Sequence, residues 1–187
     1  AAATPAPAPA AATPAPAPAV ARGVWETVDL SSAAGERPPV AGIAHARVAS
    51  HAWTAEHVDV QLPASILAAL ASGLRVDVTV SEWVRGTPPN CADSYRLRAA
   101  LLAPAASAEC NADPAVLGPA PQLQPLPAHV FDSGVVTTSA AWLTITHTFV
   151  AVPAGGQAVR IEHSGKDAEW WAGNYGARMA GAARITR

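Results

Sequence analysis

Apolar and polar residues alternate with a period of two in several short segments of this chain. In the clearest segment Leu74, Val76, Val78 and Val80 are each followed by a polar or charged residue, so every second side chain would lie on one face of a strand. The same alternation recurs in four further segments: 58–62, 97–99, 143–145 and 159–161. Segments rich in Pro and Gly at 86–90, 119–127 and 153–156 separate these runs and predict turns.

One helix is expected at residues 63–72. Pro63 suits the first turn of a helix, and Ile66, Leu67 and Leu70 then fall on one face. Short strands, turns rich in Pro and Gly, and one short helix together predict an all-β protein, an antiparallel β-sandwich.

The N-terminal segment has a composition that cannot form a core. Residues 1–9 read AAATPAPAP and residues 10–18 repeat them. Without a large side chain the segment cannot bury enough area to offset the entropy of ordering, and alternating Ala-Pro favours extended polyproline II. We therefore expect an Ala/Pro-rich spacer at 1–20 and a domain at 21–187. The spacer either lifts the domain off a surface or is a linker left by processing.

Charge and composition exclude several classes of function. Twelve Lys+Arg against fourteen Asp+Glu give a net charge of −2, so no nucleic-acid partner is expected. No apolar stretch reaches the ~18 residues of a membrane span, so no membrane insertion is expected. The sequence contains no nucleophile elbow, zinc-protease motif, P-loop or dinucleotide fingerprint. We therefore expect no enzyme, no cofactor and no metal site.

Three groups of titratable residues have an alternative interpretation. His45, His51 and His57 recur every six residues, which favours surface or loop histidines over a ligand cluster. Glu162-His163 and the acids and cation at 166–169 could form an acid–base site, but a solvated turn after a strand is favoured. Asp93 and Asp113 could hold a structural calcium ion, although nothing in their spacing requires it.

Cys91 and Cys110 are the only two cysteines. Both lie in polar, loop-like surroundings, which favours a disulfide over two unrelated buried thiols. Such a disulfide would close about twenty residues and contribute roughly 3 kcal/mol through the unfolded state.

Aromatic residues are concentrated at 170–175, which read WWAGNY. Exposed indole rings offer an apolar platform for the C–H face of a sugar, and polar neighbours take the hydroxyls. The alternative is that one Trp points into the sandwich, because consecutive residues of a strand face opposite sides.

Several motifs resemble those of the F-box-associated domain, the sugar-recognising domain of glycoprotein-targeting F-box proteins. The C-terminal segments WLTITHTF and VRIEHSGKDAEWWAGNYGARM carry the most specific similarity. The family's order is also kept upstream, by Trp53, the segment 58–62, SEWVRG, a Cys and YRLRAALL. The similarity covers roughly residues 22–187 and implies two antiparallel sheets resembling a galactose-binding jelly roll.

The resemblance also implies a ligand and a binding loop. Family members that bind sugar grip the inner chitobiose of N-linked glycans with a Tyr-Trp-Lys segment, which corresponds to Trp170, Trp171 and Ala172 here. Trp171 keeps the stacking ring, Trp170 lacks the phenol hydroxyl and Ala172 lacks the cation. Six polar or turn positions that the family shares are expected to be architectural: His147, Glu162, His163, Asp167, Gly176 and Arg178.

We therefore expect a non-catalytic, lectin-like module that binds a glycan or glycoprotein, with GlcNAc or chitobiose as the ligand. The expected ligand-binding residues are Trp170, Trp171, Asn174, Arg85, Asn90 and Asp93. The alternative is a structural or protein-interaction module that self-associates or meets a protein partner. Ala-Pro repeats stand where the family has its F-box, so no ubiquitin-ligase partner is expected. High Ala, Arg in place of Lys and the Ala-Pro spacer resemble an exported bacterial protein, secreted or held in the cell envelope.

Overall fold

The computed structural model of the chain describes residues 25–30, 38–39, 43–87, 92–105, 122–169 and 173–180. These residues form ten strands and one helix. The elements, in chain order, are β1 (Glu26–Asp29), β2 (His45–Val48), β3 (Thr54–Gln61), α1 (Ala64–Ala71), β4 (Val78–Arg85), β5 (Ser94–Pro104), β6 (Leu123–Asp132), β7 (Val136–Thr137), β8 (Leu143–Phe149), β9 (Ala158–Lys166) and β10 (Arg178–Ala180). The expected boundary between a spacer and a domain near residue 20 lies outside the described residues.

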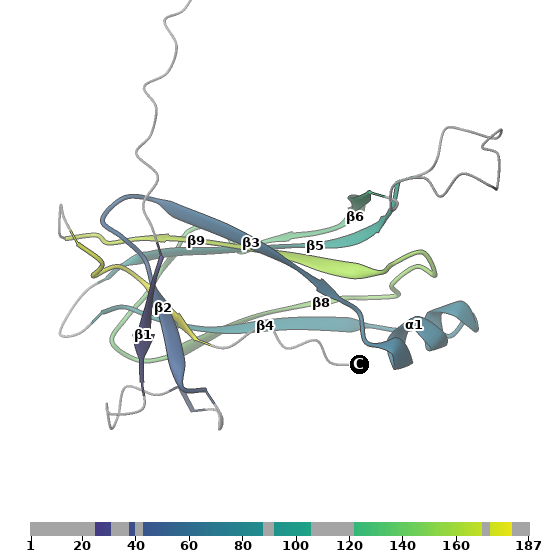
Figure 1. Cartoon of the computed structure of the whole chain (residues 1–187), viewed down its shortest axis with the longest axis horizontal. Coiled ribbons are helices and arrows are strands. Elements are labelled where there is room, and N and C mark those ends of the chain that lie inside the picture. Colours follow the sequence, from purple (N-terminus) through teal and green to yellow (C-terminus); the bar gives the residue numbers. More distant parts are fainter. Residues whose placement is uncertain are drawn as a thin grey trace, which may run out of the picture.

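The strands form two antiparallel sheets that face each other (Figure 1). Sheet A has the strand order β1-β2-β10-β4-β8, and sheet B has the order β3-β9-β5-β6 with β7 paired to β5. The chain crosses from one sheet to the other six times between β2 and β10, as in Greek-key and jelly-roll sandwiches. The predicted all-β sandwich is confirmed.

The core lies between the sheets and follows the alternation in the sequence. Val78, Val80 and Val84 of β4 point inward against Leu97 of β5 and Ile161 of β9, and all are buried. The predicted start of the β4 strand at Leu74 is wrong. Gly73 ends the helix at a φ of 77° and residues 74–77 only connect it to β4, so Leu74 is 54% exposed.

Helix α1 closes the end of the sandwich shown at the right of Figure 1. Ile66 and Leu70 are buried in the core, and Leu67 packs against its margin. Pro63 is the N-cap residue and lies just before the first turn. The helix predicted at 63–72 is thus confirmed to within one residue at each end.

The histidines at 45, 51 and 57 are exposed, as expected for surface positions. The expectation of a solvated turn at Glu162-His163 is wrong, because both residues lie inside β9 and His163 points into the core. The nine-residue β9 pairs with β5 along its whole length and with β3 from Ala158 to Gly165, and this pairing continues the strand past the expected turn.

Candidate functional site

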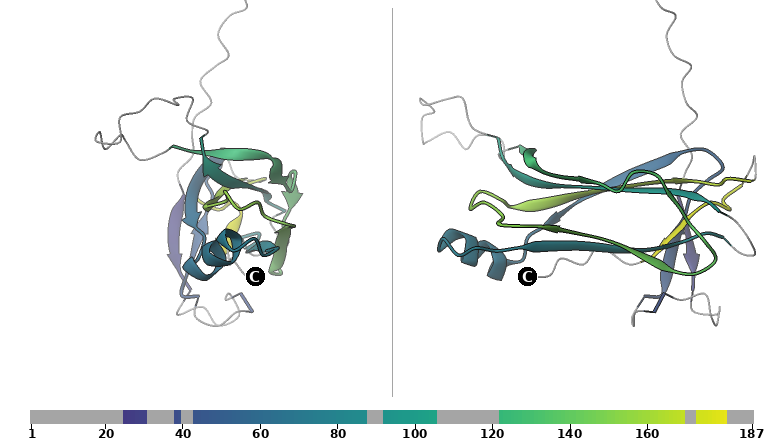
Figure 2. Two further views of the ribbon diagram at one scale, coloured as in Figure 1. Left: turned by 90° about the vertical axis from the view of Figure 1, so that its right-hand side faces the viewer. Right: turned by 180° about the vertical axis from the view of Figure 1, so that it is seen from behind.

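The end of the sandwich opposite α1 brings together segments from across the chain (Figure 2). Strands β4 and β9 end here, and β3 and β5 begin here. We call this region the loop end and define it by the described residues 49–53, 85–87, 92–93, 138, 142, 167–169 and 173–178, together with Glu26. The Trp-Trp segment of the sequence joins two of these stretches.

Asp93 holds three segments of the loop end together. Its side chain is fully buried. The Oδ2 atom accepts a hydrogen bond from the Thr87 backbone N–H at 2.9 Å, and Oδ1 accepts one from the Ala168 N–H at 3.3 Å. Its carbonyl oxygen accepts bonds from the backbone N–H and the hydroxyl of Thr138. Desolvation by burial raises the pKa of Asp93, and the two N–H donors oppose that shift.

Gly176 lies at the most crowded point of the loop end. Its N–H donates to the Ala49 carbonyl at 3.0 Å, and its own carbonyl accepts the Thr87 hydroxyl at 2.8 Å. A Cβ atom at this position would lie 2.6 Å from the Asp167 backbone nitrogen. The Nε of Arg178 donates to the Thr87 hydroxyl oxygen at 3.3 Å. Thr87 therefore links Gly176 and Arg178 to the Asp93 anchor.

A row of neighbouring side chains crosses the outer face of sheet A at this end. The row follows the strand pairing. Arg85 of β4 lies opposite Arg178 of β10. Arg178 in turn lies opposite Val48 of β2, and Val48 lies opposite Glu26 of β1. At the far end of the row the Arg85 guanidinium lies 5.5 Å from the centre of the Trp142 ring. We call these residues, together with Asn174, the polar row.

Asn174 attaches the C-terminal loop to the polar row. Its Nδ2 donates to Glu26 Oε2 at 2.9 Å. One residue earlier, the Gly173 carbonyl accepts the His51 N–H at 3.1 Å. On the other side of the Trp-Trp segment, the Glu169 N–H donates to Asp167 Oδ1 at 2.7 Å. Residues that flank the segment 170–172 are thus held by defined hydrogen bonds on both sides.

Three of the six predicted ligand-binding residues lie in the described part of the chain, and the structure brings them to one end. Arg85 is 5% exposed, Asn174 is half-buried and Asp93 is fully buried. Trp170, Trp171 and Asn90 lie outside the described residues, as do Cys91 and Cys110 with their predicted disulfide. Asp113 of the calcium alternative also lies outside them.

A network of titratable residues lies between the sheets beside the loop end. The Tyr95 hydroxyl donates to Oε2 of Glu82, and His163 Nδ1 lies 3.7 Å from Glu82 Oε1. On its other side, His163 Nε2 lies 2.9 Å from Glu56 Oε1, and Arg47 Nη2 donates to Glu56 Oε2 at 2.8 Å. We call these five residues the inner network.

Burial shifts the pKa values of Glu82 and His163 in the inner network. Desolvation raises the pKa of Glu82 to about 7, although the Tyr95 hydroxyl opposes the shift. Desolvation lowers the pKa of His163, and the hydrogen bond to Glu56 opposes that shift. Both directions favour the uncharged forms, as expected for groups removed from water.

The sequence predicts an architectural role for His163 but not the network around it. The signal was available in β4, where Glu82 occupies an inward position of the series Val78, Val80, Glu82 and Val84. A carboxylate on the apolar face of a strand needs a partner. Which partner it finds depends on the register of strands β4, β5 and β9, which a single sequence does not contain.

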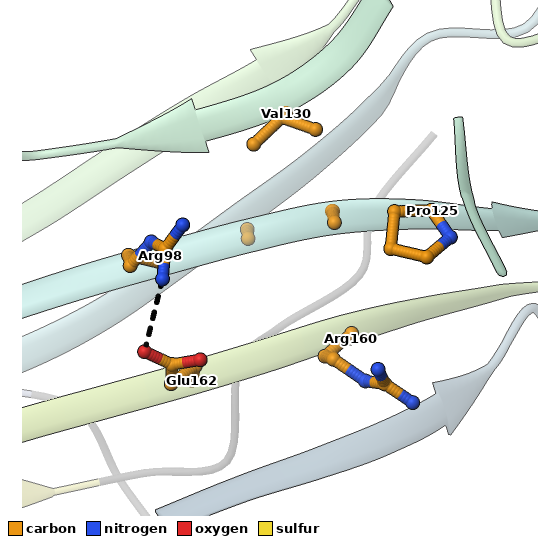
Figure 3. Close-up of a pocket in the computed structure, with 7 residues that line it drawn as sticks. Arg98, Pro125, Val130, Arg160 and Glu162 are labelled. Carbon is orange, nitrogen blue, oxygen red and sulfur yellow. Dashed lines mark hydrogen bonds and ion pairs between the residues drawn. The ribbon is translucent and has the colours of Figure 1, made fainter. Parts of the chain in front are cut away.

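The outer face of sheet B carries a separate hollow of about 280 Å³ (Figure 3). Ala100 of β5 pairs with Val130 of β6, and Leu102 pairs with Pro125. Four residues of β6 therefore lie opposite the single Leu101 of β5. This bulge lifts β6 and leaves a floor of Ala99 and Ala100, with Pro125 and Val130 along one wall.

The hollow does not fit an aromatic sugar platform. Within the part of the chain that the structure describes, no aromatic residue lines it. Its guanidinium groups are already paired, because Arg160 makes two 2.8 Å bonds to Asp59 and Arg98 lies 3.4 Å from Glu162. The loop end, by contrast, places Trp142 beside Arg85, and Glu26 beside Asn174.

Neither a membrane helix nor a metal cluster is found among the described residues. No helix there has the length and hydrophobicity of a membrane span. No three His, Cys, Asp or Glu residues within the described ranges are grouped so that they could hold a metal ion.

Comparison with known proteins identifies relatives for part of the chain. No protein-family model matches it. It is similar to human F-box only protein 44, at 30% identity over 56% of this chain and 35% of that protein. Bovine F-box only protein 6 is 28% identical over 63% of this chain and 40% of that protein. Human F-box only protein 27 is 32% identical over 60% of this chain and 34% of that protein. The chain thus spans little more than a third of the curated relatives it matches.

These relatives support the resemblance to an F-box-associated domain and correct one expectation. The expected bacterial protein, secreted or held in the envelope, is contradicted because these relatives are F-box proteins of mammals. A bias toward Ala and Arg reflects composition and does not identify a compartment. The predicted disulfide loses the secreted setting on which it rested. The expected lack of a ubiquitin-ligase partner also has no support, since the relatives are F-box proteins.

Proposed function

We propose that the loop end is a carbohydrate-binding site and that the chain is a lectin-like module for glycans or glycoproteins. The observation that carries the proposal is the attachment of Asn174 to Glu26 at one end of the polar row, next to the Trp-Trp segment. In this arrangement an amide, a carboxylate and two guanidinium groups lie along one margin of sheet A. Such groups hydrogen-bond sugar hydroxyls, and the indole rings supply the apolar contact.

The ligand that we propose is a GlcNAc-containing glycan such as chitobiose. Trp171 and Trp170 would stack on the sugar, and Asn174 and Asn90 would bind its hydroxyl and acetamido groups. Arg85 is only 5% exposed, so its role in the proposal is to support the site from below through Trp142. Asp93 is fully buried, so its role in the proposal is to fix Thr87 and Ala168. A shallow site of this kind retains only a few kcal/mol after the cost of ordering its loops, so we expect weak affinity.

The test is a titration of the full chain with chitobiose, followed by a panel of glycans, measured by calorimetry and by tryptophan fluorescence. Trp171→Ala is expected to abolish binding while the far-ultraviolet circular dichroism stays unchanged. Asn174→Ala is expected to weaken binding, because it removes a contact to the ligand and the anchor to Glu26. Leu74→Ala is the control, since Leu74 is exposed near α1 at the opposite end.

The alternative function is a structural or protein-interaction module that keeps the sandwich without binding sugar. It would gain support if the folded protein bound no glycan of the panel. Sedimentation of the same sample then distinguishes self-association from the need for a different protein partner. Unfolding of the Trp171→Ala variant would instead show that this residue is part of the core.

A further inference from the structure

The inner network joins the two sheets through charged and polar contacts. Arg47 and Glu82 come from β2 and β4 of sheet A, whereas Glu56, Tyr95 and His163 come from β3, β5 and β9 of sheet B. Glu82 is 2% exposed and Tyr95 is fully buried, so neither exchanges freely with water. Trp25 stands edge-on to the His163 ring at 5.5 Å and covers one side of it.

The contacts of His163 fix which of its nitrogens carries the proton. Glu56 accepts the Arg47 guanidinium, so its carboxylate is charged and takes a donor on its other oxygen. His163 Nε2 is therefore the donor in the 2.9 Å contact with Glu56. The Nδ1 atom then presents a lone pair, is buried and has no hydrogen-bond partner among the described residues. It faces Glu82 Oε1 at 3.7 Å.

Glu82 can satisfy this lone pair only when its carboxyl group carries a proton. Its other oxygen already accepts the Tyr95 hydroxyl. A protonated Oε1 would donate to His163 Nδ1 after a small shift of either side chain, whereas an ionised Glu82 would place a buried carboxylate against a lone pair. We propose that Glu82 and His163 share one proton in the interior, and that this proton holds the two sheets together at the loop end and makes that end responsive to pH.

The short strand β10 is the element that this proton would hold. It has three residues, and its middle residue, Met179, pairs with Arg47 on one side and with Val84 on the other. Arg47 and Val84 thus flank Met179, and Glu82 lies two residues before Val84 on the same buried face of β4. The strand follows the Asn174 loop directly, so loosening β10 would also loosen the attachment of that loop.

The charged groups around the shared proton come from every strand packed against it. Glu82 faces Tyr95 of β5 and His163 of β9, and the charge of Glu56 on β3 also acts on it. His163 is affected by Glu56, Arg47 of β2 and its chain neighbour Glu162. Burial is the largest influence on both groups and favours the pair with a neutral imidazole and a neutral carboxyl.

The sign of the pH dependence follows from these directions. The raised pKa of Glu82 means that its contribution to stability is complete below the unfolded value of 4.5 and is lost as the pH rises through about 7. The lowered pKa of His163 means that its contribution is present above 6.5 and is lost as the pH falls through the lowered value. Stability is therefore expected to be greatest in mildly acidic solution.

The experiment measures the urea midpoint of unfolding of the full chain, and the amide protection factors of β10, from about pH 5.5 to about pH 8.5. Both the urea midpoint and the protection factors are expected to fall with rising pH in the natural protein. The release of one proton limits the corresponding rise of the unfolding equilibrium constant to about tenfold per pH unit. Glu82→Gln keeps a neutral side chain at all pH values, so this dependence is expected to disappear. An equal dependence in the variant would overturn the proposal.

Tyr95→Phe provides a second test, whose expected shift in pH dependence would not arise if Glu82 had only a structural role. The Tyr95 hydroxyl favours the charged form of Glu82, so its removal is expected to shift the pH midpoint upward. Glu162→Gln is the matched control, because Glu162 lies on the outer face against Arg98 and its charge acts on His163 but is not among the influences on Glu82. The fall of stability with rising pH, which comes from Glu82, is expected to keep its natural slope in this variant. An unchanged midpoint in Tyr95→Phe would contradict the shared proton. No ligand is needed, so failure here and failure of glycan binding are separate results.

Discussion

Asp93 Oδ2 accepts the backbone N–H of Thr87 at 2.9 Å, and the other oxygen of the same buried carboxylate accepts the N–H of Ala168, 75 residues further along the chain. One side chain therefore fixes the segment after β4 to the segment after β9. The Trp-Trp segment begins two residues after Ala168, so its starting point depends on this anchor.

Replacing Asp93 by Ala is expected to destabilise the chain by about 2 to 4 kcal/mol, because two buried backbone donors lose their acceptor. Asp93→Asn is expected to cost less, because its amide oxygen can still accept one of the two bonds. Urea unfolding at neutral pH measures both values. If Asp93→Ala lowered the free energy of unfolding by less than an ordinary surface substitution does, the anchor would not be needed.

Gly176→Ala tests how closely the loop end is packed. The added Cβ would lie 2.6 Å from the Asp167 nitrogen and 2.9 Å from the Ala49 carbonyl oxygen. Backbone atoms cannot move aside as a flexible side chain can, so a loss of about 2 to 3 kcal/mol is expected.

Gly155→Ala is the matched control for this substitution. Its Cβ would meet only the Ala103 side chain at 4.0 Å, an ordinary contact. Thermal unfolding of the two variants is expected to separate them clearly. Equal melting temperatures would mean that the segments around Gly176 adjust without cost.

Much of strands β4, β5, β8 and β9 could be predicted from the sequence because their burial follows a period of two. The turn predicted at 119–127 is wrong for residues 123–127, which form the start of β6. In β5 the buried Leu97, Ala99 and Leu101 alternate with partly or fully exposed residues. The edge strand β3 follows the pattern less closely, since Val58 is 48% exposed. An edge strand is covered on fewer sides, so its apolar positions are less reliable guides to the core.

The loop end could be predicted only in part. Arg85 and Asn174 lie within the motifs that resemble the sugar-binding family, and both lie along the polar row. Their partners were not predictable, because Glu26 lies 148 residues before Asn174 in the chain and meets it only through the pairing of β1 with β2 and of β2 with β10. Asp93 was expected to bind ligand, but its fully buried position suits it to the anchoring role.

Glu56→Gln is expected to lower the pKa of His163 further below its usual value. The Glu56 carboxylate favours the imidazolium through a hydrogen bond and its charge, and the amide removes that charge. Since a lowered pKa places the loss of stability on the acid side, the loss caused by His163 protonation is expected to move to lower pH. A titration followed by nitrogen-15 NMR of the His163 ring measures the shift. An upward shift would contradict the role assigned to Glu56.

Arg96→Gln is expected to raise the pKa of Asp132. Arg96 donates two hydrogen bonds to this carboxylate, and they are the largest cause of its pKa of about 2. Asp132 keeps the Gly134 N–H at 2.9 Å and Arg98 at 3.6 Å, so its pKa should remain below the usual 3.8. A lowered pKa of Asp132 contributes stability that is present above the usual value of 3.8 and is lost as the pH falls through about 2. In the variant this contribution is expected to be smaller, and its loss is expected to be complete at a higher pH.

Carbon-13 NMR of the Asp132 carboxyl group measures this shift directly. Arg75→Gln is the control, because Arg75 pairs with a different carboxylate, Asp77, at 3.9 Å and is largely exposed. That variant is expected to leave Asp132 unchanged. If Arg96→Gln also left it unchanged, the Gly134 N–H and Arg98 would be sufficient to hold the carboxylate in its charged form, and the Arg96 pair on the outer face of sheet B would have no measurable strength in water.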